Sequence, residues 1–271
     1  MSHEFVRVGD LTDLQSYPPW LQAVVAVCHE AEQAVAEHEL FCRMRDAVLS
    51  KQATRNFLIG VWPVIEQFPQ YMAANLLKVQ FGRSRGLDMA RRYLVRNIRV
   101  EQQHAEYWLQ WAAASGISRA EVLDGSGSPA ADALSHWCSH TCQRDPLPAA
   151  MAATNYAIEG VTGRWASLVC SSNTYENGFA PQLRKSAMKW LRAHAEYDAR
   201  HPWEALDIIA AILGAQPDTR EIGLVQARVR RSYEYMRMTL DDCLVLMETS
   251  RSAMTSDCPQ VAWPTAEVSR A

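Results

Sequence analysis

Apolar residues recur with a helical period along almost the whole chain. The segments with this pattern are rich in Ala, Leu, Glu, Gln, Arg and Met, which favour helices, and short stretches rich in turn-forming residues separate them. No run of alternating β-branched residues is long enough to predict a sheet. Helices are predicted over residues 19–49, 51–80, 85–115, 129–144, 147–171, 180–214 and 217–250. The pattern therefore predicts an all-α bundle of about seven helices.

The connections between the predicted helices are short, which favours one helical domain over two. This domain is expected to span residues 19–250, after an irregular segment (1–18) and before a flexible tail (251–271). Within the domain, Pro63 and Pro69 should kink or split the second long helix.

The bulk composition changes this picture little. The chain has 271 residues, 48% of them hydrophobic, which is enough for one large core. A net charge of −3 does not point to a nucleic acid or an anionic membrane as a partner. The basic clusters ARRYLVR (90–96) and QARVRR (226–231) lie within helical patterns, and we predict that both are solvated helix faces.

The sequence shows no sign of a secretion signal or a membrane anchor. The N-terminus has no basic start followed by an apolar stretch, and no apolar run approaches the ~20 residues that a membrane helix needs. The seven cysteines are scattered without a disulfide framework. We therefore expect a soluble, cytoplasmic protein whose thiols are reduced.

The segment HAEYDARH places His194, Asp198 and His201 at spacings of four and three residues. A helix advances about 100° per residue, so these side chains point the same way, within a stripe about 60° wide. Pro202 follows directly and disfavours a helical conformation for His201, so the helix should bend or end there. A polar stripe that enters an apolar helix is expected to face something specific, although for this segment alone a surface His/Asp pair is the commoner arrangement.

Two other predicted helices add side chains of the same chemistry. Glu101 and His104 form an E-x-x-H pair, whose spacing puts a carboxylate and an imidazole on one helix face. Glu159 lies among apolar and small residues, where a carboxylate is costly to bury unless it is paired or bound to a cation. Each feature alone is a weak signal, and a surface position for Glu159 stays open.

Together the three helices supply three imidazoles and three carboxylates, with no thiolate. Such a set of nitrogen and oxygen donors suits Fe(II) or Mn(II) better than structural zinc. Six ligands are too many for one catalytic ion with open positions, and they suit two ions that share carboxylates. The segment HWCSHTC (136–142) looks like a zinc site, but in a helix its two histidines would lie about 200° from its two cysteines, so one ion could not bind all four.

The complete pattern resembles the haem-oxygenase-like diiron oxidases. It consists, in order, of Glu101-x-x-His104, Glu159 and His194-x-x-x-Asp198-x-x-His201. The resemblance covers roughly residues 20–250 and is greatest to the branch that makes terminal alkenes from medium-chain fatty acids. It implies a bundle of the type shared with haem oxygenase and thiaminase II. It also implies that the six residues are catalytic iron ligands, with Glu101, His104 and His194 on one iron and Glu159, Asp198 and His201 on the other.

The activity implied by the resemblance is O2-dependent oxidative decarboxylation of dodecanoic acid, or a close homologue, to 1-undecene and carbon dioxide. It would use two Fe(II) ions and an external reductant, supplied by an unidentified electron donor. We expect the second iron site, which lies nearer Pro202, to be the weaker one. The small residues Ala153 and Ala157 would border the substrate slot. Arg237 could meet a carboxylate, although an exposed position is the more usual one for such an arginine.

Two other functions stay open. Relatives with the same ligands act on amino acids or amines, and a metal-free helical protein that binds a small molecule would use the histidines structurally. An amino acid substrate would need a buried charged residue to meet its second charged group, whereas a fatty acid needs only a long apolar slot.

Overall fold

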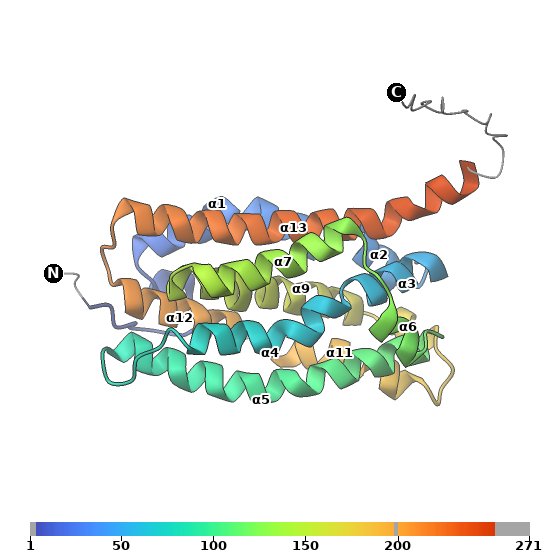
Figure 1. The fold of residues 1–271 in the computed structure, drawn as a ribbon, viewed down its shortest axis with the longest axis horizontal. Coiled ribbons are helices and arrows are strands. Elements are labelled where there is room, and N and C mark those ends of the chain that lie inside the picture. The colour runs from blue at the N-terminus through green and yellow to red at the C-terminus, as the bar shows by residue number, and fades with distance from the viewer. Residues whose placement is uncertain (1–3, 198–199, 253–271) are drawn as a thin grey trace, which may run out of the picture.

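The computed structural model describes residues 4–197 and 200–252 and shows an all-helical fold (Figure 1). The helices, in chain order, are η1 (Leu14–Ser16), α1 (Pro19–Ala36), α2 (Glu39–Arg45), α3 (Lys51–Gly60), α4 (Trp62–Leu76), α5 (Arg85–Ala114), α6 (Arg119–Asp124), α7 (Pro129–Arg144), α8 (Leu147–Met151), the π-helix η2 (Ala152–Ile158), α9 (Glu159–Cys170), α10 (Thr174–Asn177), α11 (Arg184–Tyr197), α12 (His201–Leu213) and α13 (Thr219–Ser252). Within these two stretches no β-strand occurs. The predicted all-α, single-domain fold is confirmed.

The described residues form more helices than the expected number of about seven, because several long helical patterns are interrupted. The pattern over 19–49 divides at His38, whose Nδ1 accepts a hydrogen bond (3.2 Å) from the backbone amide of Leu40 and so caps α2. The pattern over 51–80 divides just before Pro63. This proline lies in the first turn of α4, where the missing amide hydrogen costs nothing. Pro69 lies inside α4 without ending it. Only one of the two prolines therefore splits the helix.

The interruption that matters most for the candidate site lies between α11 and α12. The first of these helices ends at Tyr197 and the second begins at His201, directly before Pro202. Proline fits the first turn of a helix, so Pro202 is compatible with this start, but His201, for which a helical conformation was expected to be disfavoured, is itself the first helical residue of α12. The predicted break near His201 is confirmed.

Helix α5 contributes a buried polar stripe to the centre of the bundle. Tyr93, Asn97, Glu101 and His104 are all buried and are separated by four, four and three residues, so they share one helix face. Helices α4, α11 and α12 pack along α5. In Figure 1, α5 and α13 run along opposite sides of the bundle.

The contact between α5 and α12 requires a glycine. A Cβ atom at Gly86 would lie 2.8 Å from the backbone nitrogen of Ile212, which is closer than non-bonded atoms approach. This approach fixes the first turn of α5 against the last turn of α12. It thereby constrains the helix that begins with His201 against the helix that carries Glu101 and His104.

An aromatic cluster forms the core beside the candidate ligands. The Trp190 ring centroid lies 4.8 Å from that of Trp108 and 5.3 Å from that of Trp165, so it joins α11 to α5 and α9. Such pairs contribute about 0.5–1.5 kcal/mol each beyond the area they bury. The cluster therefore gives His194, one turn after Trp190, a rigid support.

The remaining predictions concern the surface and the chain ends. None of the helices in the described part of the chain has the length and apolar character needed to span a membrane. Six of the seven cysteines are free thiols in the structure, and Cys258 lies outside the described residues. Most of the predicted tail (251–271) lies outside them too.

Candidate metal centre

Glu101 and His104 lie one turn apart on the inner face of α5, with exposed fractions of 5% and 4%. The Nδ1 atom of His104 lies 2.9 Å from Oε2 of Glu101, so one proton, or one cation, can join the two groups. A buried carboxylate needs such a partner, because the cost of removing its charge from water is otherwise several kcal/mol. The E-x-x-H spacing therefore places the carboxylate and the imidazole on one helix face, as predicted.

His194 approaches this pair from α11. Its ring centroid lies 4.4 Å from that of His104, and the side chain is 5% exposed. One ligand atom from each of Glu101, His104 and His194 lies within 4.8 Å of the others. Metal ligands about 2.0–2.2 Å from a shared ion lie this close to one another, so the three side chains could bind one ion with little movement.

Glu159 and His201 form a second pair next to the first three residues. The Nδ1 atom of His201 lies 2.9 Å from Oε1 of Glu159. Glu159 is buried and lines the same cavity as Glu101, His104 and His194. Four predicted ligands therefore face one cavity, and His201 joins them through Glu159. Asp198, the sixth, lies outside the described residues.

Two residues that sequence reasoning missed hold Glu159 in place. The hydroxyl of Tyr93 donates a hydrogen bond (3.2 Å) to Oε2 of Glu159, and Nδ2 of Asn155 lies 3.5 Å from the same oxygen. Asn155 belongs to the π-helix η2, which runs directly into α9 at Glu159. Irregular turns of this kind are frequent at functional sites. For Tyr93 there was a signal, since it lies two helical turns before Glu101 on the same face.

The protonation states follow from burial and pairing. Burial alone would raise the pKa of Glu101, but the hydrogen bond and charge of His104 outweigh it and hold that pKa below its usual value. Burial raises the pKa of Glu159, and the negative charge of Glu101 adds to the effect, although the hydrogen bond from His201 opposes it. Burial and the nearby His104 lower the pKa of His194 to about 3, so His194 is neutral at neutral pH and able to bind a metal.

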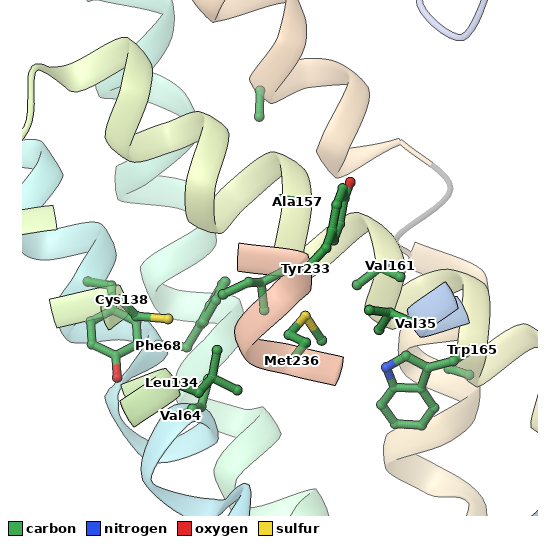
Figure 2. Close-up of a cluster of buried hydrophobic side chains, with 14 of the residues drawn as sticks. Val35, Val64, Phe68, Leu134, Cys138, Ala157, Val161, Trp165, Tyr233 and Met236 are labelled. Carbon is green, nitrogen blue, oxygen red and sulfur yellow. The ribbon is translucent and has the colours of Figure 1, made fainter. Parts of the chain in front are cut away.

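An apolar cavity leads away from the candidate ligands. Its metal end is lined by Glu101, His104, Ile158, Glu159, Thr162 and His194, together with Val64, Ile65, Phe68 and Trp190. An adjoining cavity shares Val64, Ile65, Ile158, Thr162 and Trp190 and ends among Phe41, Phe57, Val61, Leu134, Trp165, Met236, Thr239 and Leu240. Figure 2 shows Met236 with Val64, Phe68 and Leu134 on one side and Trp165 on the other. Among the described residues, the four candidate ligands are the only charged or ionisable side chains in either lining.

The three residues predicted to bind substrate lie elsewhere. Ala153 and Ala157 are fully buried in η2, which packs against α12 and α13, and neither lines the cavities. Their neighbours Ile158 and Thr162 line both. The side chain of Arg237 is 60% exposed and pairs with Asp241 at the surface. The structure therefore does not bring Arg237 to the candidate site.

The zinc-like segment is not a metal site. Its helix α7 turns Cys138 and Cys142 into the core, whereas His136 and His140 are exposed, so the two pairs lie on opposite faces as expected. Burial raises the pKa of Cys142 to about 11, with smaller effects from Thr154 and Lys78 that lower it. This thiol stays protonated and does not favour a metal.

Comparison with known proteins identifies the family. The model of a family described as iron-containing redox enzymes matches residues 55–235, a segment that contains Glu101, His104, Glu159, His194 and His201. The chain belongs to this iron-containing redox enzyme family. No functionally curated protein matches it.

Several solved structures share the fold of this family member. A TenA homologue from Pseudomonas syringae pv. tomato strain DC3000 is 50% identical, with 89% of this chain and 99% of that chain covered and a TM-score of 0.88. A domain of unknown function with a haem-oxygenase-like fold, from Shewanella denitrificans OS217, is 16% identical, with 94% and 100% covered and a TM-score of 0.66. The fold is therefore the haem-oxygenase-like fold, as the sequence resemblance implied.

The residues present fit the iron of the family. The candidate site offers imidazole nitrogens and carboxylate oxygens and no thiolate, which is the donor set of non-haem iron. His194 also donates its Nδ1 hydrogen to the Trp190 carbonyl oxygen (2.8 Å), a partner of the kind that orients metal-binding histidines.

Proposed function

We propose that this chain is an iron-dependent oxidase that uses O2 to convert a medium-chain fatty acid of the dodecanoic acid class to a terminal alkene and carbon dioxide, as an UndA-type decarboxylase. The observation that supports this proposal best is the cavity. Four candidate iron ligands line one cavity, and an apolar cavity adjoins it with no charge in its described lining. Such a shape suits a substrate with one acidic group and an unbranched apolar tail.

The proposal assigns two iron ions to the site. Glu101, His104 and His194 would bind the first, and Glu159 and His201, together with Asp198, would bind the second. Four of the five described residues of this set are buried and line one cavity, and the fifth, His201, is half-buried and contacts Glu159. When bound, the iron would supply the capacity to activate O2 for hydrogen removal from the substrate chain.

The residues of the chain would orient the substrate, supply charge and exclude water from the site. The substrate carboxylate would lie at the ligand end, and Val64, Ile65 and Trp190 would hold the tail in a water-poor slot. Tyr93 would fix the Glu159 carboxylate through its hydrogen bond.

The two alternative functions differ in measurable ways. An amino acid or an amine would leave its second charged group unpaired in the apolar part of the cavity, because the described lining offers no charge there. A metal-free binding protein would purify without iron. Iron analysis of protein isolated without chelators therefore separates that alternative from both oxidase functions.

The deciding test is headspace gas chromatography. Protein supplied with dodecanoic acid, Fe(II), ascorbate and air should release 1-undecene, and the same mixture without O2 should release none. Thiamine serves as a comparison substrate, because thiaminase II shares the fold. Absence of any alkene from acids of all medium chain lengths, by iron-loaded protein, would refute the proposed substrate class.

A further inference from the structure

The outer face of α5 and the turn before it carry an arginine stripe. The stripe comprises Arg83, Arg85, Arg91, Arg92, Arg96 and Arg99, all of them exposed. Asp88 is the only acidic residue in the same span, although the whole chain has a net charge of −3. We expected the central part of this stripe to be an ordinary solvated helix face, and its arrangement in the structure argues for more.

Much of the positive charge in the stripe is not neutralised. The side chains of Arg92 and Arg99 make no hydrogen bond or ion pair with any described residue. The guanidinium of Arg91 lies over the ring of Phe81, 5.1 Å from its centroid, and that ring is 72% exposed. Like charges three and four residues apart on a helix reduce stability. The fold therefore tolerates a repulsion that an acidic partner would relieve.

One arginine of the stripe, Arg96, approaches the candidate metal centre through Tyr93. Arg96 lies over the ring of Tyr93, with the guanidinium carbon 5.7 Å from the ring centroid, and pairs with Glu204. The Tyr93 hydroxyl in turn donates its hydrogen bond to Glu159. Tyr93 thus links the surface arginines to a candidate iron ligand, and Glu101 follows Arg99 by only two residues on the same helix.

The proposed reaction requires electrons from outside the chain. Conversion of a saturated fatty acid and O2 to an alkene, carbon dioxide and two molecules of water balances only with two additional electrons and two protons. Both electrons removed from the substrate, together with these two, reduce O2 to water. An external carrier must therefore deliver two electrons per turnover to a site that is buried.

We propose that the arginine stripe docks an acidic one-electron carrier protein, which reduces the metal centre beneath it. This inference rests on the proposed function. Charge attraction speeds encounter and orients weak electron-transfer complexes, which bury little surface. A nucleic acid would also meet the positive charge, but it would not use the position of the stripe above Tyr93 and Glu159.

The test uses the iron-loaded full chain and an acidic [2Fe–2S] ferredoxin as the probe. One variant reverses two unpaired charges of the stripe, Arg92→Glu and Arg99→Glu. The matched control is Arg230→Glu and Arg231→Glu, a reversal of the second basic cluster on α13, whose two side chains are 64% and 56% exposed. Ferredoxin binding is measured by calorimetry at low and high salt. Turnover of dodecanoic acid is measured with reduced ferredoxin and, separately, with ascorbate, which needs no docking surface.

We expect the stripe variant to lose at least about tenfold in ferredoxin affinity and in kcat/KM for ferredoxin, while its ascorbate-driven turnover matches the parent. High salt should weaken binding by the parent, and the α13 variant should behave as the parent does. Equal ferredoxin binding by stripe variant and parent would overturn the inference. So would binding of duplex DNA or of anionic vesicles, in place of ferredoxin, through the same arginines. Stripe-dependent ferredoxin binding without alkene from either reductant would refute the proposed substrate and leave the docking surface supported.

Discussion

The Nδ1 atom of His194 lies 2.8 Å from the carbonyl oxygen of Trp190, one turn earlier on α11, and the two rings stack with centroids 3.7 Å apart. Because a carbonyl only accepts, Nδ1 carries the hydrogen, and the lone pair of Nε2 is free for a metal. The aromatic cluster that supports Trp190 thus also fixes the tautomer of His194 and the direction of its ring.

The first prediction is that His104→Ala and His194→Ala each remove most of the bound iron and all oxidase activity. Each change deletes one donor from a set of three. Removal of a residue that only hydrogen-bonds to a metal ligand typically lowers metal affinity by roughly 10–100-fold. Removal of a ligand itself should lower iron affinity by more than that. The measurement is iron content by elemental analysis after anaerobic loading and desalting. His136→Ala, at an exposed position on α7, is the control and should bind iron normally. Stoichiometric iron in both of the first two variants would contradict the assignment.

The second prediction concerns the far end of the apolar cavity. Met236 lines that end, and Met236→Phe should fill part of it, so the preferred fatty acid should become shorter by about one or two carbons. Iron content should not change, because Met236 does not line the metal end. Met238→Phe is a matched control on the same helix, at a position that is 48% exposed. The preferred chain length of each variant is measured by gas chromatography of the alkenes formed. Equal preferences for Met236→Phe and Met238→Phe would show that the fatty acid tail does not reach Met236.

The third prediction is a pH dependence of the stability of the metal-free protein. The pKa of His194 is about 3 in the folded state, because of burial and the neighbouring His104, and about 6.5 in an unfolded chain. Between these values the unfolded chain binds a proton that the folded chain does not. The contribution of His194 is therefore fully present above pH 6.5 and is lost as the pH falls toward 3. The loss over the whole window is on the order of 3–5 kcal/mol.

Urea unfolding at several pH values tests this contribution by comparing the parent with His194→Phe. The variant retains a ring against Trp190 but has no proton to bind. Its free energy of unfolding should fall less steeply between pH 6.5 and 4 than that of the parent. Parallel curves for the two proteins would show that His194 is not held in its neutral form.

The sequence predicted those parts of the fold that depend on local patterns. The helical period over 85–115 corresponds to α5, and the proline after His201 marks the break between α11 and α12. The E-x-x-H spacing also predicted correctly that Glu101 and His104 share a face. These features follow from the geometry of a single helix, so no knowledge of the packing was needed.

The parts that were missed depend on packing between helices. The π-helix η2 and the support that Asn155 gives to Glu159 have no periodic signature in the sequence. Ala153 and Ala157 are small and near Glu159, but they pack against α12 and α13, and the turn of the helix presents Ile158 and Thr162 to the cavity instead. Only the arrangement of neighbouring helices decides which face of α9 and η2 lines the cavity.

The final prediction is that the two iron ions bind unequally. The donors of the first site, Glu101, His104 and His194, already lie within 4.8 Å of one another on two continuous helices. In the second site, Glu159 is engaged by His201 and Tyr93, and His201 opens a helix directly after a break. A second ion must replace these contacts, and that cost reduces its affinity.

Protonation should increase the difference between the sites. Burial lowers the pKa of His201, but the hydrogen bond and charge of Glu159 outweigh it and raise that pKa above its usual value. A proton therefore competes with the second ion at His201 as the pH falls, whereas His194 is already neutral at neutral pH and its Nε2 lone pair is free for a metal. Anaerobic Fe(II) titration followed by Mössbauer spectroscopy should show one tight ion and one weaker ion whose affinity falls at lower pH. Glu159→Gln should retain the tight ion and lose the weak one. Uptake of two ions with equal, tight affinity in the absence of substrate would show that both sites are already formed, contrary to this reasoning.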